Sequence, residues 1–248
     1  MKTIVSRQNP QIKQIAKLKL QKERIQQKKF IAEGYRTCKT IIDSDIELLE
    51  LYTTQAMLEK AKEIAPEGKI IIVAEPVMEK LSAAKAPSGL LGVFEIPKAP
   101  AMENIGSGIV LANMANPGNM GTLVRSCAAM GLKSVVCVEG TDPWAPKVVQ
   151  ASAGTIANID LFELSWEDLL KKDPHVKLIA LIVQGGKKPQ EINFKNTLLV
   201  IGNEAHGIPE QWIADCDEKL TIPMPGKTES LNAAVAGSIA IYLASQKD

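Results

Sequence analysis

Apolar residues in the first hundred positions recur at the short spacings of a small mixed α/β unit. From Asn9 to about Gln27 they form one stripe at helical spacing among many basic residues, which predicts an amphipathic helix. "KKFIAEG", closed by Gly34, and the runs "IELLELYTT", "GKIIIVA" and "GLLGVFEI" predict short strands. "YRTCKTIID" and the stretches near 55–64 and 76–83 predict helices between them. The pattern indicates a small α/β domain ending near Ile96.

The second half of the chain shows continuously apolar runs in place of alternating ones. They are "IVLA" (109–112), "SVVCV" (134–138), "KLIALIV" (177–183), "TLLVI" (197–201) and "KLTIP" (219–223). Such runs are typical of strands buried on both faces of a parallel sheet. Helical stretches separate or follow them at 119–130, 144–152, 166–172, 209–214 and from about 230 to 245. The alternation predicts a three-layer α/β domain that binds ligands at the carboxyl ends of its strands.

The segment between the two patterns reads as a linker. "PKAPAMENIGSG" carries two prolines and two glycines with little apolar content, so it has weak reason to form an element. We therefore predict one domain over residues 1–96, a linker over 97–108 and a second domain over 109–248.

Composition places the chain among ordinary folded proteins. Apolar residues make up 46% and charged residues 23% of its 248 positions. No apolar run approaches the ~20 residues of a membrane span, and "MKTIVSRQNPQIKQ" lacks the apolar core of a signal peptide. The four cysteines and two histidines show no CxxC or HxxxH spacing. We therefore expect a cytoplasmic protein with reduced thiols, no membrane association and no bound metal.

The charge is distributed unevenly. Residues 1–30 carry nine Lys or Arg and one Glu, a net +8, so the formal charge of +1 leaves −7 on the remaining 218 residues. A basic arm on an acidic body suits a protein that binds a polyanion such as RNA, although a merely solvated helix face explains the same charges. The candidate RNA contacts are Arg7, Lys13, Lys17, Lys22, Arg24 and Lys28.

Three polar loops follow predicted strands: "NPGNMGTLVRSCAAMG" (116–131), "IGNEAHGIP" (201–209) and "IPMPGKTESLNAAVAG" (222–237). Parallel strands would bring all three to one edge of the sheet. "PGKTES" is no Walker A loop, because the motif needs Gly where Thr221 stands, and "GSG" at 106–108 precedes a strand instead of following one. His206 reads as a loop residue in preference to a catalytic base.

These loops carry a recognisable set of motifs: N-x-G-x-x-x-R ending at Arg125, G-x-E-x-x-G around Glu204, and I-P-M-x-G-x-x-x-S-L-N from Ile222 to Asn232. With them the chain resembles the SpoU/TrmH-type RNA 2′-O-ribose methyltransferases of the SPOUT superfamily. The N-terminal stretch "SRQNPQIKQIAKLKLQKERIQQKKFIAEGYRT" is similar to the start of the ribosomal-protein-like substrate-binding domain that many members carry.

The resemblance implies a second domain with a deep trefoil knot that holds S-adenosyl-L-methionine. It places the cofactor near Leu181, Gly202, Ile222, Met224 and Leu231. It also implies an RNA substrate, ribosomal in preference to transfer RNA, and a homodimer through the C-terminal domain. The last helix, "SLNAAVAGSIAIYLAS", is apolar nearly all round, which independently suggests that part of it packs against something else.

The expected catalytic residues are Asn119, Arg125, Glu204, Ser230 and Asn232. Asn119 also reads as the cap of a helix that Gly131 ends. Arg125, a guanidinium near the predicted sheet edge, needs an anionic partner; in the resembling family it acts on the ribose hydroxyl, as base or as electrostatic stabiliser. We expect Glu204 to support Arg125 or the third loop, and Ser230 and Asn232 to orient substrate, cofactor or a neighbouring subunit.

Two alternative functions share this fold. A non-catalytic RNA-binding or assembly protein would be expected to lack some of Asn119, Arg125, Glu204 and Asn232, and all four are present. A base methyltransferase is disfavoured by the S-L-N motif. One departure from many relatives is "SLNAAVA", which has Ala233 and Ala234 where they have Val and Ser.

Overall fold

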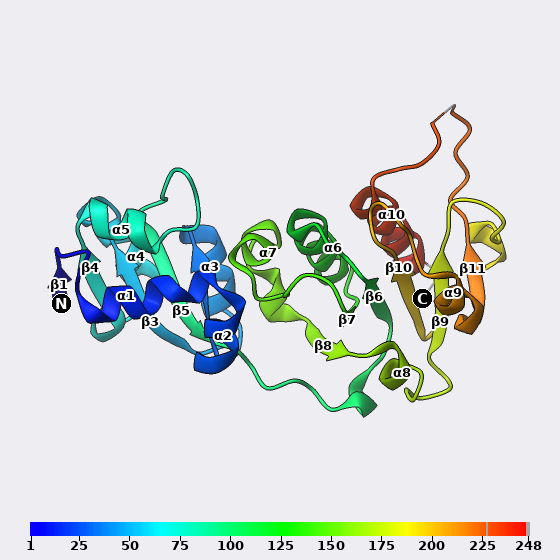
Figure 1. Ribbon diagram of the computed structural model, residues 1–248, viewed down its shortest axis with the longest axis horizontal. Helices are drawn as coiled ribbons and strands as arrows, with labels where there is room; N and C mark the ends of the chain where they lie inside the picture. Colours follow the sequence, from blue (N-terminus) through cyan, green and yellow to red (C-terminus); the bar gives the residue numbers. More distant parts are fainter. Residues whose placement is uncertain (227, 247–248) are drawn as a thin grey trace. The chain divides into compact units, whose positions relative to one another are not determined.

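The computed structural model describes residues 1–226 and 228–246, which form two compact units (Figure 1). The first unit holds Met1–Lys98 together with Trp144–Ala157, and the second holds Ala99–Pro143 and the chain from Asn158 onward. Lys227, in the third motif loop, and residues 247–248 lie outside the described part. The expected linker contains a short 3-10 helix, η4 (Met102–Asn104). That residues 1–96 and 109–248 fold as separate domains stays a prediction.

The first unit is built on a five-stranded mixed sheet with the strand order β1-β4-β3-β5-β2. β1, β4 and β3 are parallel, while β5 runs antiparallel to both of its neighbours. We did not predict β1, which is short and has two of its three residues exposed. The strands are β1 (Lys2–Ile4), β2 (Lys29–Glu33), β3 (Leu48–Thr53), β4 (Ile70–Val73) and β5 (Leu90–Glu95).

Short helices join these strands, and α7 from the later segment packs against β2. The Trp144 ring, just before α7, lies 4.7 Å from the Phe30 ring on β2, centroid to centroid. The helices of this unit are α1 (Pro10–Ala16), η1 (Lys17–Lys19), α2 (Gln21–Gln27), α3 (Tyr35–Ile42), η2 (Gln55–Met57), α4 (Leu58–Ile64), η3 (Glu67–Lys69), α5 (Glu75–Leu81) and α7 (Pro146–Ala151).

The prediction of one helix from Asn9 to Gln27 is wrong, because the helical conformation is interrupted at Leu20. Leu20 has an extended backbone (φ −95°, ψ 132°) and separates η1 from α2. The apolar stripe itself is confirmed: Ile12, Ile15 and Leu18 are buried in one core with strand residues of the sheet. Each such side chain contributes about 1.5–3 kcal/mol when fully buried, which holds α1 and η1 in place despite their dense charge.

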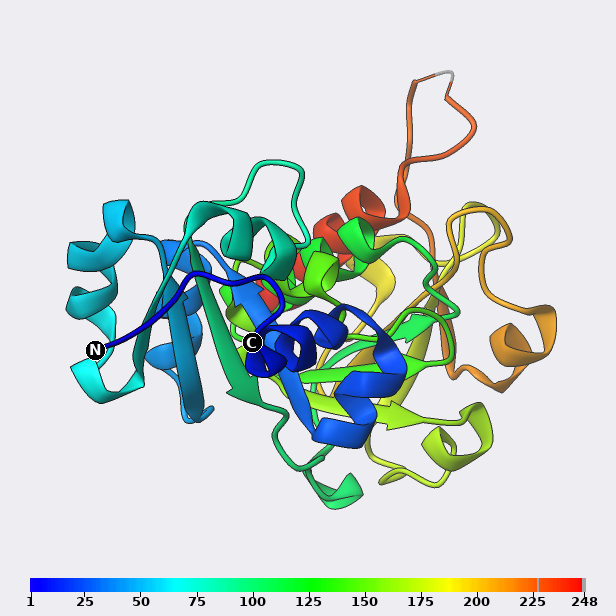
Figure 2. The same ribbon diagram turned by 60° about the vertical axis from the view of Figure 1, so that its left-hand side comes forward.

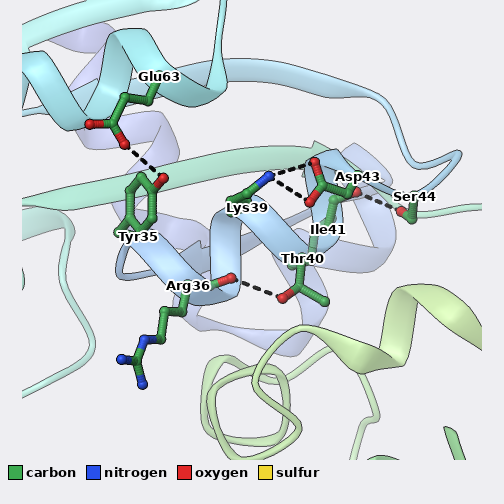
Figure 3. Close-up of polar contacts among 8 residues, drawn as sticks. All are labelled: Tyr35, Arg36, Lys39, Thr40, Ile41, Asp43, Ser44 and Glu63. Carbon is green, nitrogen blue, oxygen red and sulfur yellow. Dashed lines mark hydrogen bonds and ion pairs between the residues drawn. The ribbon is translucent and has the colours of Figure 1, made fainter. Parts of the chain in front are cut away.

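Helix α3 is held at both ends by side-chain contacts (Figure 3). The Tyr35 hydroxyl donates to the Glu63 carboxylate on α4 (2.8 Å), and Lys39 pairs with Asp43 one turn later (2.8 Å). The Arg36 side chain points away from both contacts (Figure 3). Helix α3 therefore offers an exposed guanidinium on a fixed backbone.

The second unit is built on a six-stranded sheet with the order β11-β9-β10-β6-β7-β8. Every pairing is parallel, which confirms the prediction from the continuous apolar runs. We missed β8, because Asp160 and Glu163 interrupt its apolar run. The strands are β6 (Gly108–Ala112), β7 (Ser134–Val138), β8 (Asp160–Leu164), β9 (Lys177–Leu181), β10 (Thr197–Ile201) and β11 (Glu218–Leu220).

The last helix of the second unit packs closely against α6 and β10. Gly237 makes this possible: a Cβ there would lie 2.5 Å from Leu123 Cδ2 and 2.8 Å from Ile201 Cδ1. Among the described helices, none is long and apolar enough to cross a membrane. The helices are η4, α6 (Pro117–Ala129), α8 (Trp166–Leu169), η6 (Pro189–Glu191), α9 (Glu210–Asp215) and α10 (Ala233–Ser245).

Candidate active site

The second and third motif loops, at the carboxyl ends of β10 and β11, line a pocket of about 380 Å³ together with the end of β9. The first loop, after β6, contacts these loops through hydrogen bonds, but none of its residues, all of which the structure describes, is among the lining. The third loop extends from the sheet as a long arm, and residues at its base line the pocket (Figures 1 and 2). All five residues that the resemblance placed at a cofactor line it: Leu181, Gly202, Ile222, Met224 and Leu231. The structure therefore gathers into one site residues that are spread over fifty positions of the sequence.

The second loop leaves no room for a side chain at Gly202. A Cβ there would lie 2.3 Å from the carbonyl carbon of Gly207 and 2.5 Å from the nitrogen of Ile208. Asn203 and Gly207 exchange backbone hydrogen bonds of 3.0 and 2.9 Å across the loop. The Asn203 side chain also donates to the carbonyl of Asn113 (2.8 Å), beside the first loop. Gly202 is thus required for the two sides of this pocket-lining loop to pack against each other.

Glu204 ties the second loop to the first. Its Oε1 accepts hydrogen bonds from Asn119 Nδ2 (2.9 Å) and Asn116 N (3.1 Å), and its Oε2 accepts from Ala115 N (3.3 Å). Partial burial alone raises the pKa of Glu204, but these donors outweigh it and hold that pKa below its ordinary value. Glu204 is therefore a carboxylate at neutral pH and a weak base.

The prediction that Asn119 caps its helix is wrong. Asn116 is the cap, since its Oδ1 accepts from Gly118 N (2.8 Å) and Asn119 N (3.3 Å). Pro117 begins the helix, which places Asn119 inside the first turn with its side chain free to bridge loops. Gly131, at φ 77°, follows the end of α6 as predicted.

Asn232 connects the third loop to the same network. It caps α10 through its Oδ1, which accepts from Ala234 N (2.9 Å) and Val235 N (3.2 Å), while its Nδ2 donates to Asn119 Oδ1 (3.3 Å). We expected Glu204 to support Arg125 or the third loop directly; instead it contacts the first loop and reaches the third through Asn119. The chain Glu204–Asn119–Asn232 joins all three loops.

Arg125 is exposed on α6 and is not among the described residues that line the pocket. Within the described part of the chain its guanidinium has no hydrogen-bond or ion-pair partner. The expectation that Arg125 needs an anionic partner because it lies near the sheet edge therefore loses its ground, since an exposed guanidinium can be solvated by water. Ser230, by contrast, lies at the pocket wall beside Leu231.

Several pocket residues escaped the sequence analysis. His206 lines the pocket although we interpreted it as a loop residue, and its position inside G-x-E-x-x-G was the available signal. Asn116 and Asn203 shape the loops. The only sequence signals for them are the Pro-Gly that follows Asn116 and the glycine, directly after a predicted strand, that precedes Asn203. Among the described residues, no group of three or more His, Cys, Asp or Glu is arranged to hold a metal ion.

Five of the six predicted RNA contacts are exposed in the first unit: Arg7, Lys13, Lys17, Lys22 and Lys28. Arg24 is different. It is only 3% exposed, and its Nη1 donates to the carbonyl of Leu18 (2.8 Å) across the break between η1 and α2. Arg24 is a structural residue, and its assignment to RNA is corrected.

Comparison with known proteins agrees with this geometry. Residues 107–242 match the SpoU rRNA Methylase family, and residues 9–92 match the MRM3-like substrate binding domain. The 23S rRNA (guanosine(2553)-2′-O)-methyltransferase RlmP of Bacillus subtilis is 27% identical over 98% of this chain and 98% of its own length. A 23S rRNA (uridine(2479)-2′-O)-methyltransferase of Streptomyces viridochromogenes is 28% identical over 77% of this chain and 73% of its own length.

A solved structure shares the whole architecture. The AdoMet-bound rRNA methyltransferase of Sinorhizobium meliloti superposes with a TM-score of 0.86 at 27% identity, covering 99% of this chain and 97% of that chain. The match to the family spans more than half of the chain and includes all three motif loops. This protein belongs to the SpoU rRNA Methylase family.

Proposed function

We propose that this protein transfers the methyl group of S-adenosylmethionine to a ribose 2′-hydroxyl of RNA, and that the RNA is ribosomal instead of transfer RNA. One observation carries the proposal: a single pocket collects the five expected cofactor residues, and the Glu204–Asn119–Asn232 chain joins the two loops that line it to the first motif loop. The two rRNA 2′-O-methyltransferase relatives support the same chemistry.

The pocket suits a bent S-adenosylmethionine. Ile222 and Leu231 offer apolar walls for the adenine, while the bare backbone at Gly202 lets the main chain donate and accept hydrogen bonds close to the ligand. The bound cofactor supplies a sulfonium methyl group, which needs no further activation. The relative from Sinorhizobium meliloti was solved with AdoMet bound, which supports this assignment.

Methyl transfer to a hydroxyl is an in-line displacement. The ribose oxygen forms a bond to the methyl carbon as the carbon–sulfur bond breaks, and the hydroxyl proton is lost to water. Alignment of the three atoms supplies much of the rate. Arg125 would stabilise the negative charge that develops on the oxygen, and remains protonated throughout. Ser230 and Asn232 would orient the substrate, and Glu204 would position the loops without accepting the proton.

We further propose a homodimer that completes the site. Val235, Ile239 and Tyr242 are 49%, 36% and 51% exposed on one face of α10, and with Thr122 on α6 they line a shallow apolar depression. A monomer would leave this patch in water. Since Arg125 on the adjacent α6 does not line its own pocket, a partner pairing across this face would supply the partner subunit's Arg125 to the cofactor.

Two properties of the resembling family belong to the same proposal. A trefoil knot is supported by α10, which returns to pack on α6 and β10. A crystal structure in which the path of the backbone contains no knot would contradict it. A cytoplasmic location is supported by the four free cysteines and by an rRNA substrate.

Mapping of 2′-O-methyl groups tests the function. Ribosomal and transfer RNA from cells with and without the gene are compared position by position. We expect one ribosomal 2′-O-methyl mark to disappear with the gene and to return when the purified protein and S-adenosylmethionine are added. Unchanged maps in both RNA classes would contradict the proposal.

A further inference from the structure

A second cavity, of about 490 Å³, lies inside the first unit and takes no part in methyl transfer. Its walls come from the end of β2, from the loop between α5 and β5, and from α7. That loop rises from the unit as an arch (Figure 1). The cavity is large enough for a nucleoside and lies within the size range of ligand sites.

The walls combine small apolar groups with a few polar ones. Ile31 and the small side chains of Ala84, Ala86 and Ala151 provide apolar surface. Glu33 supplies a half-buried carboxylate. This is the composition of a site for a planar ring that is held on its faces by apolar contacts and along one edge by hydrogen bonds.

Glu33 also holds the loop in shape. Its carboxylate oxygens accept from the Ser82 hydroxyl (2.8 and 2.7 Å), and Oε1 accepts from Ser88 N (3.0 Å). The Ser82 hydroxyl in turn accepts from Ala84 N (2.9 Å). A carboxylate has about four acceptor positions. Oε2 therefore keeps capacity for a further donor, and the loop is organised before a ligand arrives.

The charges around the cavity favour one orientation of a nucleotide. Lys85 and Lys147 are exposed residues of its lining, from the loop and from α7, and can reach phosphates outside. Glu33 repels a phosphate from the interior but accepts from the N–H groups of a base. Guanine N1–H can donate to the one acceptor position that Glu33 keeps, whereas the corresponding N1 of adenine carries a lone pair that the carboxylate repels. Gln150 adds an amide that can donate to the guanine O6.

We propose that this cavity binds an unpaired guanine of the RNA substrate, base inward and phosphates toward Lys85 and Lys147. The proposal rests on RNA being the substrate, as argued above. It gives the first unit a specific role: selecting the RNA strand by one extruded base.

The test measures RNA binding by the full chain without cofactor, using fluorescence anisotropy at fixed salt. The probes are single-stranded hexamers that contain one guanine, or adenine in its place. We expect the guanine hexamer to bind roughly tenfold more tightly, the usual range for recognition of one base edge. Equal binding of the two hexamers would overturn the proposal. Free GMP binding as tightly as the hexamer would also overturn it, since the ligand would then be a nucleotide instead of RNA.

Three variants and one control locate the effect. Glu33→Gln keeps an acceptor for the loop hydrogen bonds but loses the charge, so the preference for guanine should fall to about twofold or less with an unchanged melting temperature. Ala84→Phe fills the cavity without touching Glu33 and should remove the same preference. Lys147→Ala should weaken both hexamers alike, whereas Lys62→Ala, whose ammonium already pairs with Glu59, should change neither. Retention of the guanine preference in both Glu33→Gln and Ala84→Phe would overturn the proposal.

The outcome is separable from that of the proposed function. Hexamer binding requires no methyl transfer, and S-adenosylmethionine binding is followed independently by calorimetry. A protein that prefers the guanine hexamer but does not methylate RNA would contradict only the proposed function. A protein that methylates RNA but binds both hexamers equally would contradict only this inference.

Discussion

Asn119 on α6 donates a hydrogen bond from its side-chain amide to the Glu204 carboxylate, with 2.9 Å between Nδ2 and Oε1. Both residues belong to motifs that the sequence analysis assigned to catalysis. Their contact shows a more specific role for Glu204: it fixes the relative position of the first two loops. The carboxylate also accepts from two backbone N–H groups of the first loop. Loss of its charge should therefore loosen the pocket.

We predict that Glu204→Gln weakens S-adenosylmethionine binding roughly three- to tenfold, because hydrogen bonds to a charged group are stronger than neutral ones but are screened at an exposed site. Calorimetry measures this change. An affinity equal to that of the wild type would show that the loops hold their positions without the carboxylate.

The same variant gives a pH test. The pKa of Glu204 is lowered in the folded protein, so its stabilising effect is fully present above the unfolded pKa of about 4.3 and is lost as the pH falls through the folded value. The melting temperature of the wild type should exceed that of Glu204→Gln at pH 7, and the gap should close as the pH falls below about 4.3. A gap that widens on acidification would contradict the assigned direction.

Gly202→Ala should disrupt the second loop, because its Cβ would overlap backbone atoms of Gly207 and Ile208. Overpacking of this kind costs about 1–3 kcal/mol, which corresponds to a melting temperature lower by roughly 2–12 °C. Cofactor binding should be lost with it. Gly106→Ala, in open space within the same unit, is the matched control and should leave both properties unchanged.

Ile239→Asp should convert the dimer into a monomer, since it places a charge on the exposed apolar face of α10. Light scattering measures the mass; methyl transfer should fall while cofactor binding persists. Leu170→Asp, at an exposed leucine directly after α8, should leave the dimer intact. A wild-type protein that is monomeric at micromolar concentration would contradict the proposal that a partner subunit completes the active site.

Arg24 and Lys17 should respond in opposite ways to removal of their charge. Arg24→Ala should lower the melting temperature, because its buried guanidinium bonds the Leu18 carbonyl. Lys17→Ala, on the exposed surface, should leave stability unchanged. It should reduce, by about one, the steepness with which the logarithm of the RNA-binding constant falls with the logarithm of the salt concentration. A stable Arg24→Ala variant with a reduced salt slope would restore Arg24 to the RNA-binding surface.

The parallel sheet was predictable because its strands are buried on both faces and their sequences are continuously apolar. β8 was missed, since Asp160 and Glu163 interrupt that signal, and the break at Leu20 was missed because its apolar side chain fits a helical stripe. The pocket residues followed from motif resemblance, whereas the contacts among them did not. Which asparagine caps α6 depends on where Pro117 begins the helix, and the partner of Glu204 depends on how three distant loops meet.

The central claim is tested most directly by alkaline digestion of ribosomal RNA labelled with the methyl group of S-adenosylmethionine. A 2′-O-methyl group blocks attack of the ribose hydroxyl on the adjacent phosphate, so label on ribose is recovered in alkali-resistant dinucleotides. We predict this result for the wild type, and a rate roughly 10²-fold lower for Arg125→Ala with unchanged cofactor affinity and melting temperature. Label recovered in mononucleotides, or near wild-type turnover by Arg125→Ala, would contradict the account.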